Sequence, residues 1–138
     1  MIRRAGHEDM SDVLEIRRMV FIVGQDVPED LERDGLDDKA IHVIAFHEGQ
    51  AIGTARLLIE GDSAKIGRVS VLEELRGKGH GTALMHFVLD ELRREAVTVA
   101  KLASQTHALQ FYEALGFQAH GPEFLDAGIS HRNMTLVL

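Results

Sequence analysis

The chain has 138 residues, of which 45% are hydrophobic, and it carries a formal net charge of −7; this length favours one domain with a sizeable core, and the acidic charge disfavours nucleic acid as a partner. No apolar run approaches the roughly 18 residues that span a bilayer, and no apolar segment follows the N-terminal arginines, so we expect neither membrane insertion nor a signal peptide. The absence of cysteine excludes disulfides, thiolate metal sites and a cysteine nucleophile, and it is compatible with a cytoplasmic location.

The first half of the chain predicts a helix followed by a meander of strands. Residues 2–5 can form a short strand, and apolar side chains recur at helical spacing over residues 9–23. Glycine and proline interrupt residues 24–40, which predicts a loop with about one helical turn. Two β-rich runs predict a hairpin over residues 41–60, and a second turn leads to a strand over residues 66–72.

The second half alternates between helix and strand. Amphipathic spacing predicts a helix over residues 82–96, and a β-rich run predicts a strand over 97–103. A second helix is expected over 106–117 and a final strand over 132–138. A meander followed by strand, helix, strand, helix and strand predicts an α+β (three-layer α/β) fold. We expect a mixed, mostly antiparallel central sheet flanked by helices, in a single domain over residues 1–138.

A glycine-rich cationic turn, R-G-K-G-H-G at residues 76–81, joins the strand over 66–72 to the helix that follows. Glycine lets backbone N–H groups approach a phosphate, and the positive end of a helix favours an anion there. A nucleotide P-loop is excluded because Lys78 precedes the last glycines, and the spacing and the upstream meander exclude a dinucleotide fingerprint. From the turn alone, a phosphate-binding loop and a turn that binds nothing both remain open.

The R-G-K-G-H-G turn resembles the R/Q-x-x-G-x-G/A motif of the GNAT superfamily of acyl-CoA-dependent N-acyltransferases, in which this turn wraps the pyrophosphate of coenzyme A. G-R-V-S-V-L, at residues 67–72, looks like the family's central strand, and A-L-Q-F-Y-E-A-L-G-F, at residues 108–117, is similar to its A-x-x-F-Y-E-x-x-G-F signature. Residues 20–28 and 124–134 also resemble the small bacterial ElaA-like branch, with Gly24 where a glutamate is common in that branch.

This resemblance implies an N-acetyltransferase that uses acetyl-CoA and no metal, and in which a primary amine attacks the thioester directly. It implies a sheet whose central strands splay apart, so that the pantetheine arm bonds to the main chain of Val69 and Val71. Tyr112, the only tyrosine, takes the position of the family's general acid, a role that suits a phenol. The coenzyme A contacts implied in this way are Val69, Ser70, Val71, Arg76, Gly77, Lys78, Gly79, His80, Gly81, Thr82, Gln105 and Phe111.

The general base and the acceptor remain open. Candidate bases are Glu74, His107, His131 and the acidic residues of 29–38, which we expect either as a solvated loop or as a rim facing a cationic acceptor. The acceptor is expected to be a small-molecule or peptide amine, and a metabolite, a polyamine, an antibiotic and a protein amine are all compatible with the sequence. A homodimer is compatible with the fold. A non-catalytic acyl-CoA-binding sensor or interaction module is the alternative function.

Overall fold

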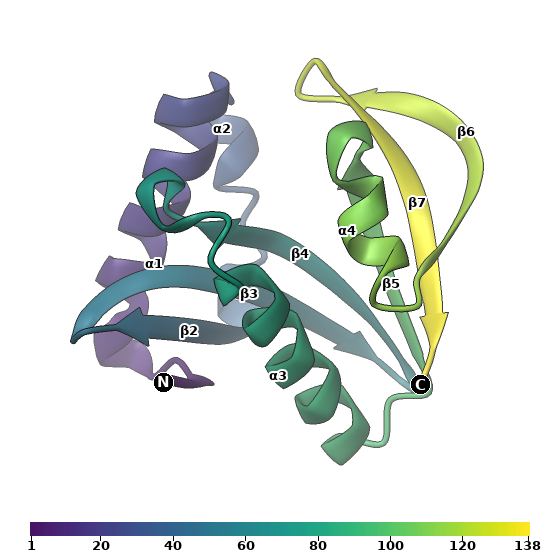
Figure 1. The fold of residues 1–138 in the computed structure, drawn as a ribbon, viewed down its shortest axis with the longest axis horizontal. Helices are drawn as coiled ribbons and strands as arrows, with labels where there is room; N and C mark the ends of the chain where they lie inside the picture. Colours follow the sequence, from purple (N-terminus) through teal and green to yellow (C-terminus); the bar gives the residue numbers. More distant parts are fainter.

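A seven-stranded mixed sheet runs through the structure, a computed structural model that describes residues 1–138. Its strands are β1 (Ile2–Arg4), β2 (Ile41–His47), β3 (Gln50–Glu60), β4 (Ser63–Val71), β5 (Val99–Gln105), β6 (Gln118–Asp126) and β7 (Ile129–Val137). They follow the order β1-β2-β3-β4-β5-β7-β6, and every neighbouring pair is antiparallel except β4 and β5 (Figure 1). The predicted mixed, mostly antiparallel sheet is therefore confirmed.

Helices cover both faces of this sheet (Figure 1). α1 (Met10–Arg17), its π-helical continuation (Arg18–Val23) and the short α2 (Glu29–Glu32) lie on one side, and α3 (His80–Arg94) and α4 (Leu109–Glu113) pack on the other. The three predicted layers are thus present, and no helix combines the length and apolar character needed to cross a bilayer. Single 3₁₀ turns occur at His7–Asp9, Asp37–Lys39, Glu73–Leu75 and Thr106–Ala108.

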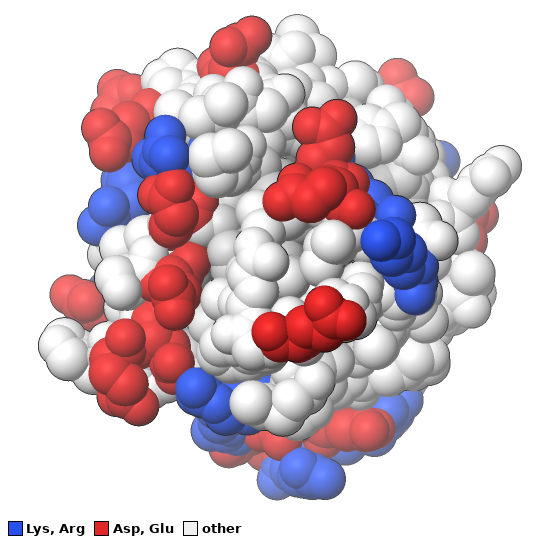
Figure 2. All heavy atoms as spheres, turned by 60° about the vertical axis from the view of Figure 1, so that its left-hand side comes forward, with Lys and Arg blue, Asp and Glu red and all other residues white.

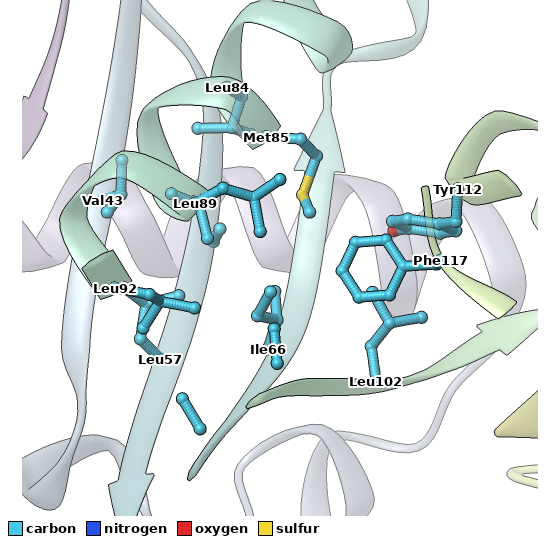
Figure 3. Close-up of a cluster of buried hydrophobic side chains, with 14 of the residues drawn as sticks. Val43, Leu57, Ile66, Leu84, Met85, Leu89, Leu92, Leu102, Tyr112 and Phe117 are labelled. Atoms are coloured by element: carbon cyan, nitrogen blue, oxygen red, sulfur yellow. The ribbon is translucent and has the colours of Figure 1, made fainter. Parts of the chain in front are cut away.

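The face of α3 that packs on the sheet carries apolar residues at helical spacing (Figure 3). Leu84, Val88 and Leu92 are completely buried and belong to a core cluster of 18 side chains. Burying one such side chain contributes about 1.5–3 kcal/mol to stability. Glu91 is buried beside them because its Oε2 accepts a hydrogen bond of 2.6 Å from Nε of Arg4 in β1. This ion pair ties α3 to the first strand.

β4 and β5 stay paired over only three residues and then part. Residues 63–65 pair in parallel with residues 99–101. Beyond them a β-bulge on the other edge of β4 sets Arg68 and Val69 opposite the single residue Ala55 of β3. Arg68 has a φ of 53°, in the left-handed region that side-chain-bearing residues seldom adopt. Because a bulge bends and twists its strand, β4 diverges from β5, and the predicted splaying of the central strands is confirmed.

β6 is a strand that the sequence analysis did not predict. Gly121 and Pro122 interrupt its pattern, and most of its side chains are exposed. It pairs only with β7 at the edge of the sheet, with a shift of register between His120 and Phe124. Proline has no N–H to donate to a neighbouring strand. It is tolerated here because β6 is an edge strand and its register with β7 is irregular at this point. The strand therefore forms without a clear signal in the sequence.

Several predicted strands also begin at different residues. β4 begins at Ser63, three residues earlier than predicted, because a tight turn with Gly61 at a φ of 62° returns the chain from β3. β5 begins at Val99 because the N–H of Val97 donates to the carbonyl of Leu92 and still belongs to the end of α3. β7 extends three residues further toward the N-terminus than predicted, because it continues as far as its turn with β6.

A network of buried ion pairs joins α1 to the loop that follows it. Nε of Arg17 donates to Glu32 at 2.7 Å, and Nη1 of Arg17 donates to Asp37 at 2.7 Å. The side chains of Arg17 and Glu32 are 1% and 2% exposed. Arg56 of β3 donates to Asp34 at 2.7 Å and 2.8 Å and to Asp37 at 3.2 Å. The hydrogen bonds from Arg56 hold the pKa of Asp34 far below the ordinary carboxylate range.

Arg68 in the β-bulge completes this network. Its guanidinium donates to the carboxylates of Glu32 and Asp34, each at 3.2 Å, and to the main-chain carbonyls of Leu31 and Glu32. Three guanidiniums thus face three carboxylates. The acidic residues of 29–38 are therefore divided: three lie in the network, and the other three, Glu29, Asp30 and Asp38, are exposed.

Replacing Arg17 with methionine should lower the free energy of unfolding by about 3–5 kcal/mol, because it leaves two carboxylates without their main partner in a buried site. The measurement is urea unfolding followed by circular dichroism. The matched control is Arg18→Met, since Arg18 is the neighbouring residue and its pair with Glu15 is exposed; the expected loss is about 0.5 kcal/mol or less. Equal losses for the two variants would contradict a stabilising role for the network.

Candidate active site

A cleft of about 310 Å³ opens where β4 and β5 part. Residues 65–71 of β4 form one wall and residues 102–105 of β5 form the other. Tyr112 of α4 and Arg76 also line it, and Phe21 lies in the lining from the α1 side. The cleft is the direct result of the parted strands, because β5 offers no partner to β4 beyond residue 65.

The main chain of Val69 and Val71 faces this cleft. The N–H of Leu72 donates to the carbonyl of Ile52 in β3 at 2.9 Å. Main-chain groups alternate between the two edges of a strand, so those of Val71 and Val69 are directed away from β3. Nε of Arg76 donates to the carbonyl of Val71 at 2.9 Å, which leaves the N–H of Val71 as a donor toward the cleft.

Ser70 has a different part in the same strand. The residue is 4% exposed, and its hydroxyl donates to the carbonyl of Arg68 at 3.1 Å. This hydrogen bond spans the bulge and stabilises its shape. Ser70 belongs to the cleft lining, so the cofactor contact predicted for it is compatible with a position in the wall.

The glycine-rich turn presents a row of free backbone donors. No hydrogen bond within the chain takes up the N–H groups of residues 77–82. Gly77 and Gly79 have φ angles of 76° and 87°, and a Cβ at either position would meet no protein atom within 4 Å. Gly79 is the N-cap of the 15-residue α3 and offers no side-chain cap, so the positive end of the helix dipole is open to an anion.

Exposed Arg76 and Lys78 add two positive charges to this turn. Figure 2 shows the side that carries α1 and the β2–β3 turn, where Asp and Glu side chains are spread over the surface and Lys and Arg gather in several groups between them. Free N–H groups, a helix N-terminus and two cations fit a pyrophosphate. The phosphate-binding loop predicted from the sequence therefore has the hydrogen-bond donors and the open space that a pyrophosphate needs.

His80 within the turn and Phe111 beside it are not in the wall of the cleft. The His80 ring packs edge-on against His47 at 4.9 Å between centroids. The Phe111 ring lies under Gly81, where a Cβ would come within 3.5 Å of it, and packs edge-on against Tyr112. Phe111 therefore supports the turn by packing, and it is not among the residues that line the cleft.

Tyr112 reaches the cleft from the core. The residue is 9% exposed, and its ring packs edge-on against Phe117 (Figure 3) and against Phe111. Burial raises the pKa of the Tyr112 hydroxyl to about 12. The phenol therefore keeps its proton throughout the physiological pH range, as a proton donor must.

Three polar side chains in the lining of the cleft are joined by hydrogen bonds. Gln105 of β5 donates to Oε1 of Gln25 at 2.8 Å, and Nε2 of His107 lies 2.7 Å from Oε1 of Gln105. The amide of Gln105, predicted as a cofactor contact, is thus already engaged within the chain. Gln25 was not singled out as a site residue, because nothing in the local sequence indicates a partner 80 residues away.

The candidate general bases differ in position. Glu74 is exposed and lines neither the cleft nor the smaller pocket beside it, and Nε2 of His107 is occupied by Gln105. His131 of β7 lines both cavities. Gly24, which stands where the ElaA-like branch often has glutamate, is exposed and lines neither. Of the histidines and glutamate proposed, His131 alone faces both cavities with a ring nitrogen free of side-chain partners.

A family model for an acetyltransferase (GNAT) domain matches residues 9–138. The chain belongs to the GNAT acetyltransferase family. It is 37% identical to YyaT, an uncharacterized protein of Bacillus subtilis, over 92% of this chain and 88% of YyaT. The structure of an acyl-CoA N-acyltransferase from Pseudomonas aeruginosa is 30% identical, with a TM-score of 0.85 over 98% of this chain and 96% of that chain.

Escherichia coli ElaA has the same fold, with 25% identity and a TM-score of 0.87 over 98% of both chains. The resemblance to the GNAT superfamily and to its ElaA-like branch is therefore confirmed, as is the prediction of an N-acetyltransferase.

In this GNAT protein, Gly79→Val should raise the dissociation constant for coenzyme A by about tenfold or more, because a side chain at Gly79 would occupy the space of a phosphate and disturb its donors. Isothermal titration calorimetry measures the effect. Gly61→Val is the control: Gly61 also has a positive φ and open space around it, but lies in the β3–β4 turn. Added salt should weaken binding to the wild type. Unchanged affinity for coenzyme A in the Gly79 variant would refute the assignment of the glycine-rich turn as the pyrophosphate site.

Proposed function

We propose that this GNAT enzyme transfers an acetyl group from acetyl-CoA to a primary amine by direct attack of the amine on the thioester. One observation carries the proposal: the free main-chain groups of the parted β4 continue into a turn with six unpaired N–H groups. An acyl-CoA has the matching order of groups, since a thioester and a pantetheine arm lead to a pyrophosphate. The Pseudomonas relative is named as an acyl-CoA N-acyltransferase, which supports the same cosubstrate class.

The protein groups have separate roles in this proposal. The main chain of Val69 and Val71 bonds to the pantetheine amides in the manner of an added strand. The N–H of Val71 donates to the thioester carbonyl, where negative charge develops during the attack. Residues 77–82 hold the pyrophosphate through backbone donors, with Arg76 and Lys78 as counter-charges. These contacts orient the acyl group, which converts an encounter of two molecules into a reaction within one complex.

Tyr112 is the proposed general acid. Tyr112 belongs to the cleft lining, and burial raises the pKa of its hydroxyl to about 12. A protonated phenol beside the sulfur donates its proton as the C–S bond breaks, so that the leaving group departs as a thiol. With no cysteine in the chain, transfer through a cysteinyl acyl-enzyme is excluded, which agrees with direct attack.

A thiol-release assay tests the proposal. The protein is incubated with acetyl-CoA and a panel of cationic, anionic and neutral primary amines, and free coenzyme A is measured together with the acetylated amine. Calorimetry on the same preparation measures acetyl-CoA binding. The proposal predicts that the protein binds acetyl-CoA and releases free coenzyme A only when an amine is present. The amount of coenzyme A released should equal the amount of acetylated amine. Tight binding with no turnover on any amine would contradict it and favour a non-catalytic acyl-CoA sensor.

Tyr112→Phe should lower kcat by about 100-fold, the range of a lost general acid. The affinity for acetyl-CoA should stay unchanged, because the phenyl ring keeps the edge-on packing against Phe111 and Phe117. Steady-state kinetics with a saturating amine, compared with calorimetric affinity, separates these two quantities. A variant with full kcat would remove Tyr112 from the proposed mechanism.

A further inference from the structure

A second, smaller pocket adjoins the cleft on the side away from the glycine-rich turn. Its volume is about 80 Å³, and it shares residues such as Phe21, Arg68 and His131 with the larger cleft. It lies between the α2 region and the β6–β7 turn, and its apolar lining includes Phe21, Val27, Leu31 and Ile129. A ligand in this pocket would meet the thioester end of the cleft.

The uncompensated charge of this pocket is negative. Glu32 and Arg68 both line it, but they bind each other and are held in the buried ion-pair network. Asp126 at the end of β6 is the other charged residue in the lining. It makes no salt bridge and its residue is exposed. A cation entering the pocket would thus find one carboxylate without a salt-bridge partner, at an exposed position of a lining that also contains apolar side chains.

His131 has its proton-accepting nitrogen available. Nδ1 lies 2.7 Å from the carbonyl of Ile129, an acceptor only, so Nδ1 must carry the hydrogen. In the neutral ring, Nε2 then has a lone pair. The ring stacks on Phe124 at 5.8 Å between centroids, and β7 pairs His131 with Gln105 of β5. The strand pairing, the stacking and the Nδ1 hydrogen bond together fix the orientation of the ring.

We propose that the smaller pocket binds the acceptor, a primary alkylammonium with a short apolar body, and that Asp126 attracts its charge while Nε2 of His131 removes its proton. This inference rests on the proposed acetyl transfer and adds the class of acceptor and the general base. The five apolar residues of the lining favour an acceptor with an apolar body, and no unpaired carboxylate other than Asp126 is present for a second charged end. The unpaired carboxylate disfavours one that carries its own carboxylate beside the amine.

The reaction balances with these groups. The ammonium passes one proton to Nε2 of His131, and the neutral amine attacks the thioester carbonyl carbon. The C–N bond forms and the C–S bond breaks, and the sulfur takes the proton of the Tyr112 hydroxyl. The second proton that the nitrogen sheds returns to the oxygen of Tyr112. His131 releases its proton to solvent, so an ammonium and a thioester yield an amide, a thiol and one proton.

His131→Asn tests the general base. The asparagine amide can keep the hydrogen bond to the carbonyl of Ile129 but lacks Nε2. With n-butylamine, kcat should fall by about 100-fold, while calorimetric affinity for acetyl-CoA stays unchanged. The loss should be smaller with trifluoroethylamine, which is largely deprotonated at neutral pH. His120→Asn is the matched control, because His120 lies in the same hairpin, is exposed and bonds only to Thr135. Full kcat in His131→Asn would overturn the assignment.

Three amines with one carbon skeleton test the acceptor class in the wild type. n-Butylamine should have a higher kcat/KM than putrescine, which adds a charge at the far end, and than norvaline, which adds a carboxylate beside the amine. Asp126→Asn should raise KM for n-butylamine about fivefold, the size of one exposed ion pair, and leave kcat unchanged. Preference for putrescine or norvaline, or an unchanged KM in Asp126→Asn, would overturn the acceptor class.

These outcomes are distinct from a failure of the proposed function. If acetyl-CoA does not bind, or no amine of any class is acetylated, the transferase proposal itself fails. If putrescine or norvaline is acetylated in preference to n-butylamine, the transferase proposal stands and the acceptor assignment is wrong.

Discussion

The site depends on the β-bulge that holds Arg68 in a left-handed conformation. For a residue with a side chain this conformation costs about 1–2 kcal/mol. Four hydrogen bonds from the Arg68 guanidinium to the α2 region offset that cost. Because the same bulge bends β4 away from β5, one set of contacts both anchors the loop after α1 and opens the cleft. Without the bulge, β5 would continue to pair with β4 and close the cleft.

This arrangement explains how an acidic protein can present an anion site. The carboxylates near the cleft are largely neutralised by Arg17, Arg56 and Arg68, so the three ion-paired acids add no net charge beside it. The anion-binding end of the cleft is made chiefly of main-chain N–H groups at the start of α3. Backbone donors keep their position whatever the surface charge.

The sequence predicts the elements and motifs that depend on local chemistry. The glycine turn, the amphipathic α3 and the hairpin of β2 and β3 follow from spacing and turn residues, and the structure confirms them. The family resemblance also predicted the splayed central strands. It could not locate the bulge at Arg68, because no local pattern marks an arginine for a positive φ.

Long-range pairing accounts for what the sequence analysis missed. β6 has a weak pattern because an edge strand tolerates Pro122 and exposed side chains. The acidic loop could not be assigned to internal ion pairs, since its partners lie on three other elements. The pairing of Gln25 with Gln105 and the free Nε2 of His131 likewise depend on contacts between distant parts of the chain.

A titration with coenzyme A followed through backbone amide resonances tests the central claim most directly. The account predicts the largest shifts at the N–H groups of Val69 and Val71, which are directed away from β3, and of residues 77–82, which have no acceptor in the free protein. Amides of β1 and β2 should change little. Saturable binding that leaves the amides of 77–82 unchanged and shifts a different face would contradict the account.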